Sequence, residues 1–120
     1  MKYAEIKNIL NSIDSPVEKL EMLMDFGKEL SVVPTDAVCT DILGCSSMVQ
    51  ICRKDNHFYA KADSDIVKGI VAVLISMVDG KTPQEIKNMD LQAEFDSLNL
   101  KLGIARIGGL NSMILFLKNL

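Results

Sequence analysis

Residues 66–78 constrain the fold more than any other stretch, because they form an almost uninterrupted apolar run of 13 residues. The run contains a single charge, Lys68, and is well short of the roughly 20 residues that span a bilayer. An Asp-Ser-Asp cluster at 63–65 offers helix-capping side chains before the run, and Asp79-Gly80 ends it. A helix that is apolar on all sides must be covered on all sides. We therefore expect a buried helix around which the other elements pack.

The length and charge of the chain indicate one domain that works with a protein partner. A chain of 120 residues, 48% of them apolar, can form a single core over residues 1–120 without disulfides or a metal ion. The net charge of -3 leaves no basic face for nucleic acid or for an anionic membrane surface. No basic and apolar leader precedes the first amphipathic pattern, so we expect a cytoplasmic protein.

Two amphipathic helices are expected in the N-terminal part of the chain. Apolar residues at helical spacing predict the first helix over residues 2–13. Ser15 suits the N-cap of the second helix, with Pro16 at its first position and Gly27 at its end. We expect these two helices to pack against each other as a hairpin.

The middle of the chain predicts an α+β fold. Residues 28–44 show no periodic pattern and contain Pro34, so a long loop is expected there. Residues 48–53 and 58–62 are rich in strand-forming types and flank a polar turn, which predicts a β-hairpin. We expect a small antiparallel β-sheet covered by helices, with a third strand that the pattern does not place.

Three further helices are expected after the buried one. The segment 82–85, Thr-Pro-Gln-Glu, is a capping box that predicts a short helix to about Asn88. Another is expected over residues 91–98. The last helix contains two adjacent glycines and carries one apolar stripe, which docks it on the core. The residues of the stripe are Ile107, Leu110, Ile114 and Leu117.

The three cysteines occur in a chain without a secretion signal, which argues against a disulfide framework and predicts at least one free thiol. Cys52 lies inside a predicted strand and is interpreted as a small apolar packing residue. Cys39 lies in the predicted loop and stays open as a second or resolving thiol. Cys45 directly follows Gly44 at the end of that loop, where a thiol can be presented to a partner.

Four stretches, taken together in order and spacing, resemble the SufE family of cysteine desulfuration proteins. They are ILGCSSMV at 42–49, YAKADSDIVKG at 59–69, DGKTPQEI at 79–86 and RIGGL at 106–110. The sequence departs from the family pattern at Gln50, where tryptophan is usual, and at Gly108, where asparagine or glutamine is usual. It also has two residues fewer between Asp65 and Ile66. These departures affect the structure expected for the loop that contains Cys45, the matching sulfur-acceptor residue, and the choice of desulfurase partner.

The resemblance implies a SufE/NifU-like fold and an accessory sulfur carrier rather than an enzyme. In this family the cysteine matching Cys45 accepts a persulfide from a cysteine desulfurase and passes it on for iron–sulfur cluster assembly. The implied partners are a SufS-like desulfurase, which holds the pyridoxal phosphate, and a downstream cluster scaffold. No cofactor or metal ion is expected on this chain, and the sequence leaves open a monomer or a homodimer.

The residues around Cys45 suit a persulfide carrier. Gly44 allows a sharp turn or the close approach of another chain, and the small side chains of Ser46 and Ser47 offer hydroxyls to a thiolate or persulfide. Arg106 lies near the start of the last helix, where the helix dipole disfavours a cation, so an anionic neighbour is expected. The resemblance puts this arginine close to Cys45, where it would lower the pKa of the thiol.

The cluster of Asp63, Ser64 and Asp65 has two compatible interpretations. The simpler one is that these side chains cap the buried helix. The resemblance also implies that the acceptor loop packs over this helix start, so the same side chains would hold the loop backbone.

Three alternatives remain open at this point. Cys39, Cys45, Cys52 and His57 are conceivable ligands of zinc or a cluster, as in an IscU-like scaffold, although their spacings match no compact ligand pattern. A small cysteine hydrolase would need His57 as the base for Cys45 and an orienting third group. A binding module, in which Cys45 is only structural, is the third.

Overall fold

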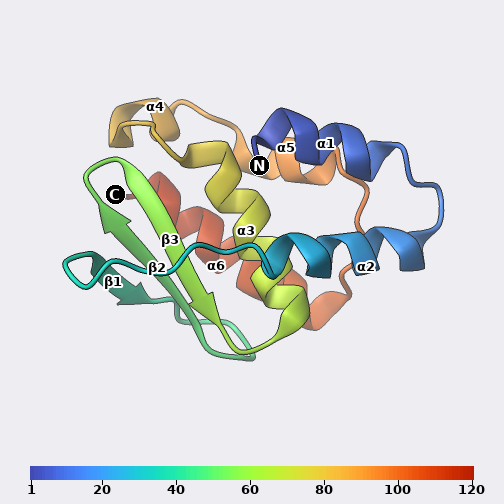
Figure 1. Cartoon of the computed structure of the whole chain (residues 1–120), viewed down its shortest axis with the longest axis horizontal. Coiled ribbons are helices and arrows are strands. Elements are labelled where there is room, and N and C mark those ends of the chain that lie inside the picture. The colour runs from blue at the N-terminus through green and yellow to red at the C-terminus, as the bar shows by residue number, and fades with distance from the viewer.

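The computed structural model describes residues 1–120 and confirms the α+β class. In Figure 1, α3 runs through the middle of the molecule, between the sheet on one side and α1 and α2 on the other. The helices are α1 Tyr3–Asn11, α2 Pro16–Gly27, α3 Asp65–Val78, α4 Pro83–Lys87, α5 Leu91–Asp96 and α6 Ile104–Lys118, and the strands are β1 Val38–Asp41, β2 Val49–Lys54 and β3 His57–Ala62.

The predicted buried helix is α3, and it forms the centre of the core. It packs against α2, β3, α1, α5 and α6, which cover most of its surface, while Lys68, Ala72 and Ser76 stay partly exposed. Ile70, Val71, Val73 and Leu74 are fully excluded from solvent. The length of the apolar run therefore matches the width of a small domain, whose core α3 passes through. None of the helices is both long and apolar enough to cross a membrane.

Helices α2 and α3 approach each other through glycines. A Cβ atom on Gly69 of α3 would overlap the carbonyl oxygen of Leu23 and lie 2.7 Å from its carbonyl carbon. A Cβ on Gly27 would lie 2.6 Å from the backbone nitrogen of Gly69. The two backbones are thus in contact, which only residues without a side chain permit.

The capping signals in the sequence are confirmed for two helices. The Ser15 hydroxyl accepts a hydrogen bond from Glu18 N at the start of α2, with Pro16 at the first helical position. Thr82 and Glu85 form the reciprocal capping box of α4. These signals are local, so they do not depend on the rest of the fold.

The sheet is a three-stranded antiparallel meander in the order β1-β2-β3. The predicted hairpin is β2 and β3, joined by Asp55 and Asn56, with Asp55 at a φ of 55°. The third strand is β1, Val38–Asp41, which lies within the segment 28–44 that was predicted to be a loop. That prediction is wrong at these four residues, because all of them are exposed and show no alternating pattern.

The apolar stripe predicted for α6 is only partly right. Leu110 and Leu117 are buried, but Ile107 is 47% exposed and Met113 is buried in its place. Gly109, just before Leu110, is buried against Cys45 in the connection between β1 and β2, whereas Ile107 and Gly108 are exposed.

Candidate functional site

Cys45 lies in the connection between β1 and β2, residues 42–48, which we call the Cys45 loop. The base of the loop is closed by a hydrogen bond from Ile42 N to Val49 O at 2.9 Å. Its end is held by Asp63, whose carboxylate accepts from Met48 N at 3.1 Å and whose own N–H donates to Met48 O at 3.4 Å. Asp63 thus ties the loop to the turn that precedes α3.

The tip of the loop packs against the first half of α6. The Cys45 thiol donates a hydrogen bond to the carbonyl of Gly109 at 3.7 Å, within the range for sulfur. A Cβ atom on Gly109 would lie 3.2 Å from the Cys45 Sγ. Gly44 has a φ of 89°, and a Cβ there would lie 2.6 Å from the Ser112 Oγ. Glycine is therefore required on both sides of the contact.

The surroundings of Cys45 keep its thiol in the neutral form. The side chain is half-buried, and burial raises the pKa of the Cys45 thiol above its usual value. Raising the pKa of an acid widens the pH range in which it stays protonated, and only the protonated thiol can donate to Gly109. In the resting protein Cys45 is accordingly a shielded, weakly nucleophilic thiol.

The two serines after Cys45 differ in their surroundings. Ser46 is exposed. The Ser47 hydroxyl is buried and has no hydrogen-bond partner. A buried hydroxyl without a partner carries the full cost of its lost hydration.

Of the three polar residues before α3, only Asp63 contacts the Cys45 loop through its side chain. Ser64 is at the N-cap position of α3 but its side chain makes no capping hydrogen bond, so the capping expected of it is wrong. Asp65 is exposed in the first helical turn, where a carboxylate complements the helix dipole. The Asp63 carboxylate is thus used by the loop and not by the helix.

Arg106 lies in the first turn of α6 and is exposed. Its guanidinium donates to the carbonyl of Leu102 at 3.1 Å. This carbonyl, just before the helix begins, is a local partner that the sequence did not indicate. Arg106 therefore lies on the same helix as Gly109, but its guanidinium hydrogen-bonds to the backbone before that helix. It makes no hydrogen bond to the Cys45 loop.

The remaining two cysteines form a disulfide bond, Cys39–Cys52, which corrects the expectation of no disulfide. The strand register places these residues directly opposite each other on β1 and β2. Cys52 is fully buried, as a packing residue would be, but it is also half of a cross-link. The sequence could not indicate the pairing because β1 was not predicted.

The two alternatives that use several cysteines or His57 are not favoured. The disulfide consumes Cys39 and Cys52, and no three potential ligands gather as a metal site would require. His57 bonds to the Asp79 carboxylate at 3.3 Å. Cys45 precedes β2 and His57 follows it. The two ends of β2 are five residue steps apart, which is roughly 17 Å along an extended strand. His57 is thus at the wrong end of the strand to act as a base.

Exposed apolar side chains occur on the Cys45 loop and at the start of α6, the helix that the loop contacts. Leu43 and Met48 belong to the loop and are 83% and 47% exposed. Ile104 and Ile107, in the first turn of α6, are 90% and 47% exposed. These four residues form what we call the apolar rim. Exposed apolar groups of this size around a site are typical of a surface that binds another protein.

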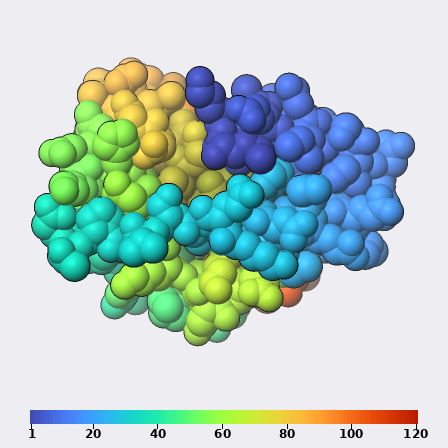
Figure 2. All heavy atoms as spheres, in the orientation of Figure 1, coloured from blue at the N-terminus to red at the C-terminus, as the bar shows by residue number.

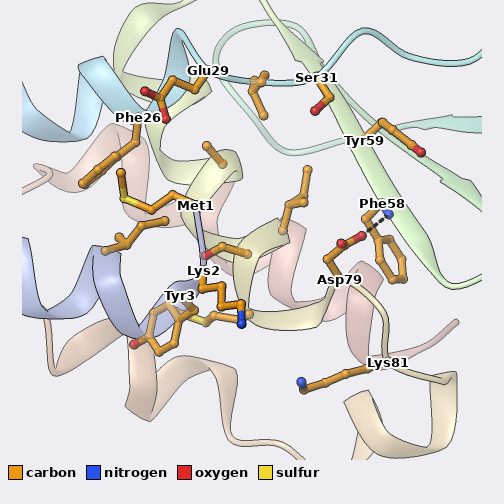
Figure 3. Close-up of a pocket in the computed structure, with 16 residues that line it drawn as sticks. Met1, Lys2, Tyr3, Phe26, Glu29, Ser31, Phe58, Tyr59, Asp79 and Lys81 are labelled. Carbon is orange, nitrogen blue, oxygen red and sulfur yellow. Dashed lines mark hydrogen bonds between the residues drawn. The ribbon is translucent and has the colours of Figure 1, made fainter.

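A sizeable cavity lies away from Cys45. It has a volume of about 610 Å³ and lies between the ends of α1 and α2, β3 and α3. Figure 3 shows Phe26, Phe58 and Tyr3 around it, with Lys2 and Lys81 to one side. No residue of the Cys45 loop lines it. The face that contains it is the one seen in Figure 2, where α6 is almost hidden.

Comparison with known proteins identifies the family. A family model described as "SufE: Fe-S metabolism associated domain" matches residues 4–120. The chain belongs to the SufE family. It is also 31% identical to the sulfur acceptor protein CsdE of Escherichia coli (strain K12) over 117 residues, which cover 90% of this chain and 80% of that protein.

The fold of this SufE-family chain is shared with a solved structure of low sequence identity. The solution structure of a hypothetical protein from Thermus thermophilus matches with a TM-score of 0.69 at 12% identity, covering 98% of this chain and 90% of that one. The family match includes the Cys45 loop and α6, so the contact between them lies within the SufE domain.

The sequence did not single out Gly109 and Ser112 as site residues, although both contact the Cys45 loop. A signal was present, because two adjacent glycines inside a helix oppose helix propensity and require a packing reason. The structure supplies that reason for Gly109, whose position is buried against Cys45.

Gly109→Ala is expected to push Cys45 away from α6 and to raise its rate of alkylation by a bulky maleimide about threefold or more. The added Cβ would lie 3.2 Å from the Sγ, closer than a comfortable contact. Gly108→Ala is the matched control, because its Cβ would lie 4.0 Å from the nearest atom, the Gly44 carbonyl oxygen. Equal alkylation rates in the two variants would show that Gly109 does not hold the thiol.

Proposed function

We propose that this chain is the sulfur acceptor and carrier of a cysteine desulfurase, with Cys45 as the accepting residue. The observation that carries the proposal is that the one free cysteine of a SufE-family chain sits, half-buried, in a loop that glycines fit closely against α6. A carrier needs a thiol that is protected between transfers and can be exposed for each one.

The transfer is a thiol exchange. The Cys45 thiolate attacks the outer sulfur of the desulfurase persulfide, forming a new S–S bond while the bond to the desulfurase cysteine breaks. The desulfurase cysteine leaves as a thiolate, and Cys45 carries the sulfur as a persulfide. No electron is gained or lost overall, so the chain needs no redox cofactor for this step.

The resting geometry requires the thiol to move before it reacts. Cys45 must release the Gly109 carbonyl and lose its proton, because a buried neutral thiol is a poor nucleophile. Docking of the desulfurase on the apolar rim would turn the Cys45 loop outward and bring the thiol to its active site. The unpartnered Ser47 hydroxyl could then donate to the sulfur anion.

Arg106 is the residue we propose to stabilise that anion once the loop has turned. It is exposed on the first turn of α6 and its present partner is a neutral carbonyl, so the guanidinium can be released at little cost. An opposite charge within about 4 to 6 Å lowers the pKa of an acid by roughly one to three units.

Arg106→Ala is expected to slow sulfur acceptance about tenfold near neutral pH, with Arg106→Lys in between. The sign follows from the charge: removing a cation raises the pKa of the thiol, so less thiolate is present at a given pH. The pH profile of the acceptance rate should therefore shift upward in Arg106→Ala. An unchanged rate and profile would return Arg106 to a purely local role at the start of α6.

In this proposal the chain is an accessory protein that stimulates its desulfurase. It removes the persulfide from the desulfurase cysteine, which would otherwise block the next turnover of that enzyme. We further predict a SufS-like pyridoxal phosphate enzyme as partner, a downstream cluster scaffold as recipient, and a cytoplasmic location.

The test of the proposal incubates the chain with a cysteine desulfurase and free cysteine and then measures the intact mass of the chain. Gain of one sulfur atom and faster cysteine consumption support the proposal, and no gain in mass contradicts it.

A further inference from the structure

The Cys39–Cys52 disulfide has no part in the sulfur transfer proposed above, yet it lies close to the Cys45 loop in the sequence. It joins β1, the edge strand, to β2, the central strand of the sheet. β1 ends at Asp41 and the Cys45 loop begins at the next residue. The cross-link therefore fastens the strand that leads directly into the loop.

Other attachments of β1 are weak. Its four residues are all exposed, so burial contributes little to holding it. The side chain of Gln50 donates to Asp41 at 2.7 Å, and Lys54 pairs with Asp36 at 3.0 Å, both at the surface. Exposed pairs of this kind contribute little to stability because water and salt screen them. Apart from its backbone ladder with β2, the disulfide is the main link between β1 and the sheet.

The two sulfurs of the cross-link differ in their access to solvent. Cys39 belongs to an exposed strand position, whereas Cys52 is fully buried. An incoming thiolate can reach only the Cys39 side, so Cys52 is the leaving group. Cys52 stays directly opposite Cys39 in the strand register, so it can attack the mixed disulfide at Cys39 and reverse the step, which favours reductants with a second thiol that can resolve it.

We propose that Cys39 and Cys52 form a thiol–disulfide exchange site for dithiol reductants, and that its reduction loosens β1 and with it the Cys45 loop. A reductant thiolate attacks the Cys39 sulfur and forms a mixed disulfide while Cys52 leaves and takes a proton. The second thiol of the reductant then displaces Cys39, which is protonated in turn. Two electrons and two protons pass to the protein, and the reductant ends as a disulfide.

The consequence for Cys45 follows from the loop's anchors. In the oxidised chain both ends of the Cys45 loop are fixed, one by the cross-linked β1 and the other by Asp63. Reduction weakens only the first anchor. The thiol should then leave its place beside Gly109 more often, while the helical core around α3 stays intact.

The test measures the free thiols and their reactivity in the full chain, without a desulfurase, so its outcome is independent of whether Cys45 accepts sulfur. The chain is purified without reductant, or treated with dithiothreitol and desalted, and then alkylated with a bulky maleimide. Peptide mapping gives the label at each cysteine. The oxidised chain should label at Cys45 alone and the reduced chain also at Cys39, with Cys45 labelled about threefold or more faster. Oxidised dithiothreitol should restore the first pattern.

Two further measurements make the result decisive. In Cys39→Ser the Cys45 rate should be high and unaffected by dithiothreitol, because the cross-link is absent in both conditions. Hydrogen exchange should speed up on reduction over residues 38–48 but not over α3. Labelling of all three cysteines in the oxidised chain, an unchanged Cys45 rate on reduction, or faster exchange throughout α3 would each overturn the proposal.

Discussion

Gly69→Ala is expected to destabilise the fold by about 3 kcal/mol, a large share of the roughly 5 to 15 kcal/mol that stabilises a typical domain. The added methyl group would overlap the Leu23 carbonyl oxygen and lie 2.7 Å from the Leu23 Cγ. Because the first obstacle is backbone, no side-chain rotation relieves it, and α2 must move away from α3. Urea unfolding followed by circular dichroism measures the loss.

Gly108→Ala is the matched control for this prediction, since it adds the same methyl group to a helix. Its nearest neighbour would be the Gly44 carbonyl oxygen at 4.0 Å, so it should be neutral or stabilising by about 1 kcal/mol through helix propensity. Gly27→Ala, on the other side of the contact, should destabilise in the same sense as Gly69→Ala. Equal stability of Gly69→Ala and Gly108→Ala would refute the close contact of the two backbones.

Cys45→Ser is expected to abolish sulfur acceptance while leaving the fold unchanged. Serine nearly preserves the size of the side chain and its hydrogen bond to Gly109, but a hydroxyl is not a thiolate and cannot form a persulfide. Intact mass after incubation with a cysteine desulfurase and cysteine should show no added sulfur. Ser31→Ala, at an exposed position outside the Cys45 loop, is the control and should gain sulfur at the wild-type rate.

A reduced fraction of sulfur in Cys45→Ser, instead of none, would mean that another cysteine accepts it. Circular dichroism and binding to the desulfurase should match wild type, because the apolar rim is unchanged. Loss of binding together with loss of transfer would instead favour the view that Cys45 is a structural residue of a binding surface.

The elements that the sequence predicted well are those set by local chemistry. The start of α2 at Pro16 and the capping box of α4 follow from hydrogen bonds between residues three apart. The buried α3 follows from its composition alone, because an apolar run needs cover whatever the topology. The α+β class follows from the predicted β-hairpin and helices, which are local patterns as well.

Features that depend on contacts between distant segments were missed or misplaced. β1 is short, exposed and defined only by its pairing with β2, so no pattern marks it. Without β1 the opposition of Cys39 and Cys52 could not be seen, and the count of three cysteines pointed away from a disulfide. Gly109 is unusual inside a helix, but its neighbour Cys45 lies 64 residues away in the sequence.

The residues of the site show the same difference between local patterns and contacts of distant segments. Gly44 and Cys45 were singled out from their place at the end of a loop, and Asp63 from its place before α3. Whether Asp63 serves the helix or the loop depends on where the loop lies, which the sequence leaves open. The partner of Arg106 likewise depends on the path of the chain before α6, where the Leu102 carbonyl is within reach.

The central claim is that Cys45 is the residue that carries the sulfur, and locating the added atom tests it most directly. Wild-type chain is charged by a cysteine desulfurase with cysteine, its persulfide is capped by alkylation without reductant, and its peptides are mapped by mass spectrometry. We predict that the extra sulfur is found on the peptide containing Cys45, with Cys39 and Cys52 still joined to each other. Extra sulfur on Cys39 or Cys52, with Cys45 unmodified, would contradict the account.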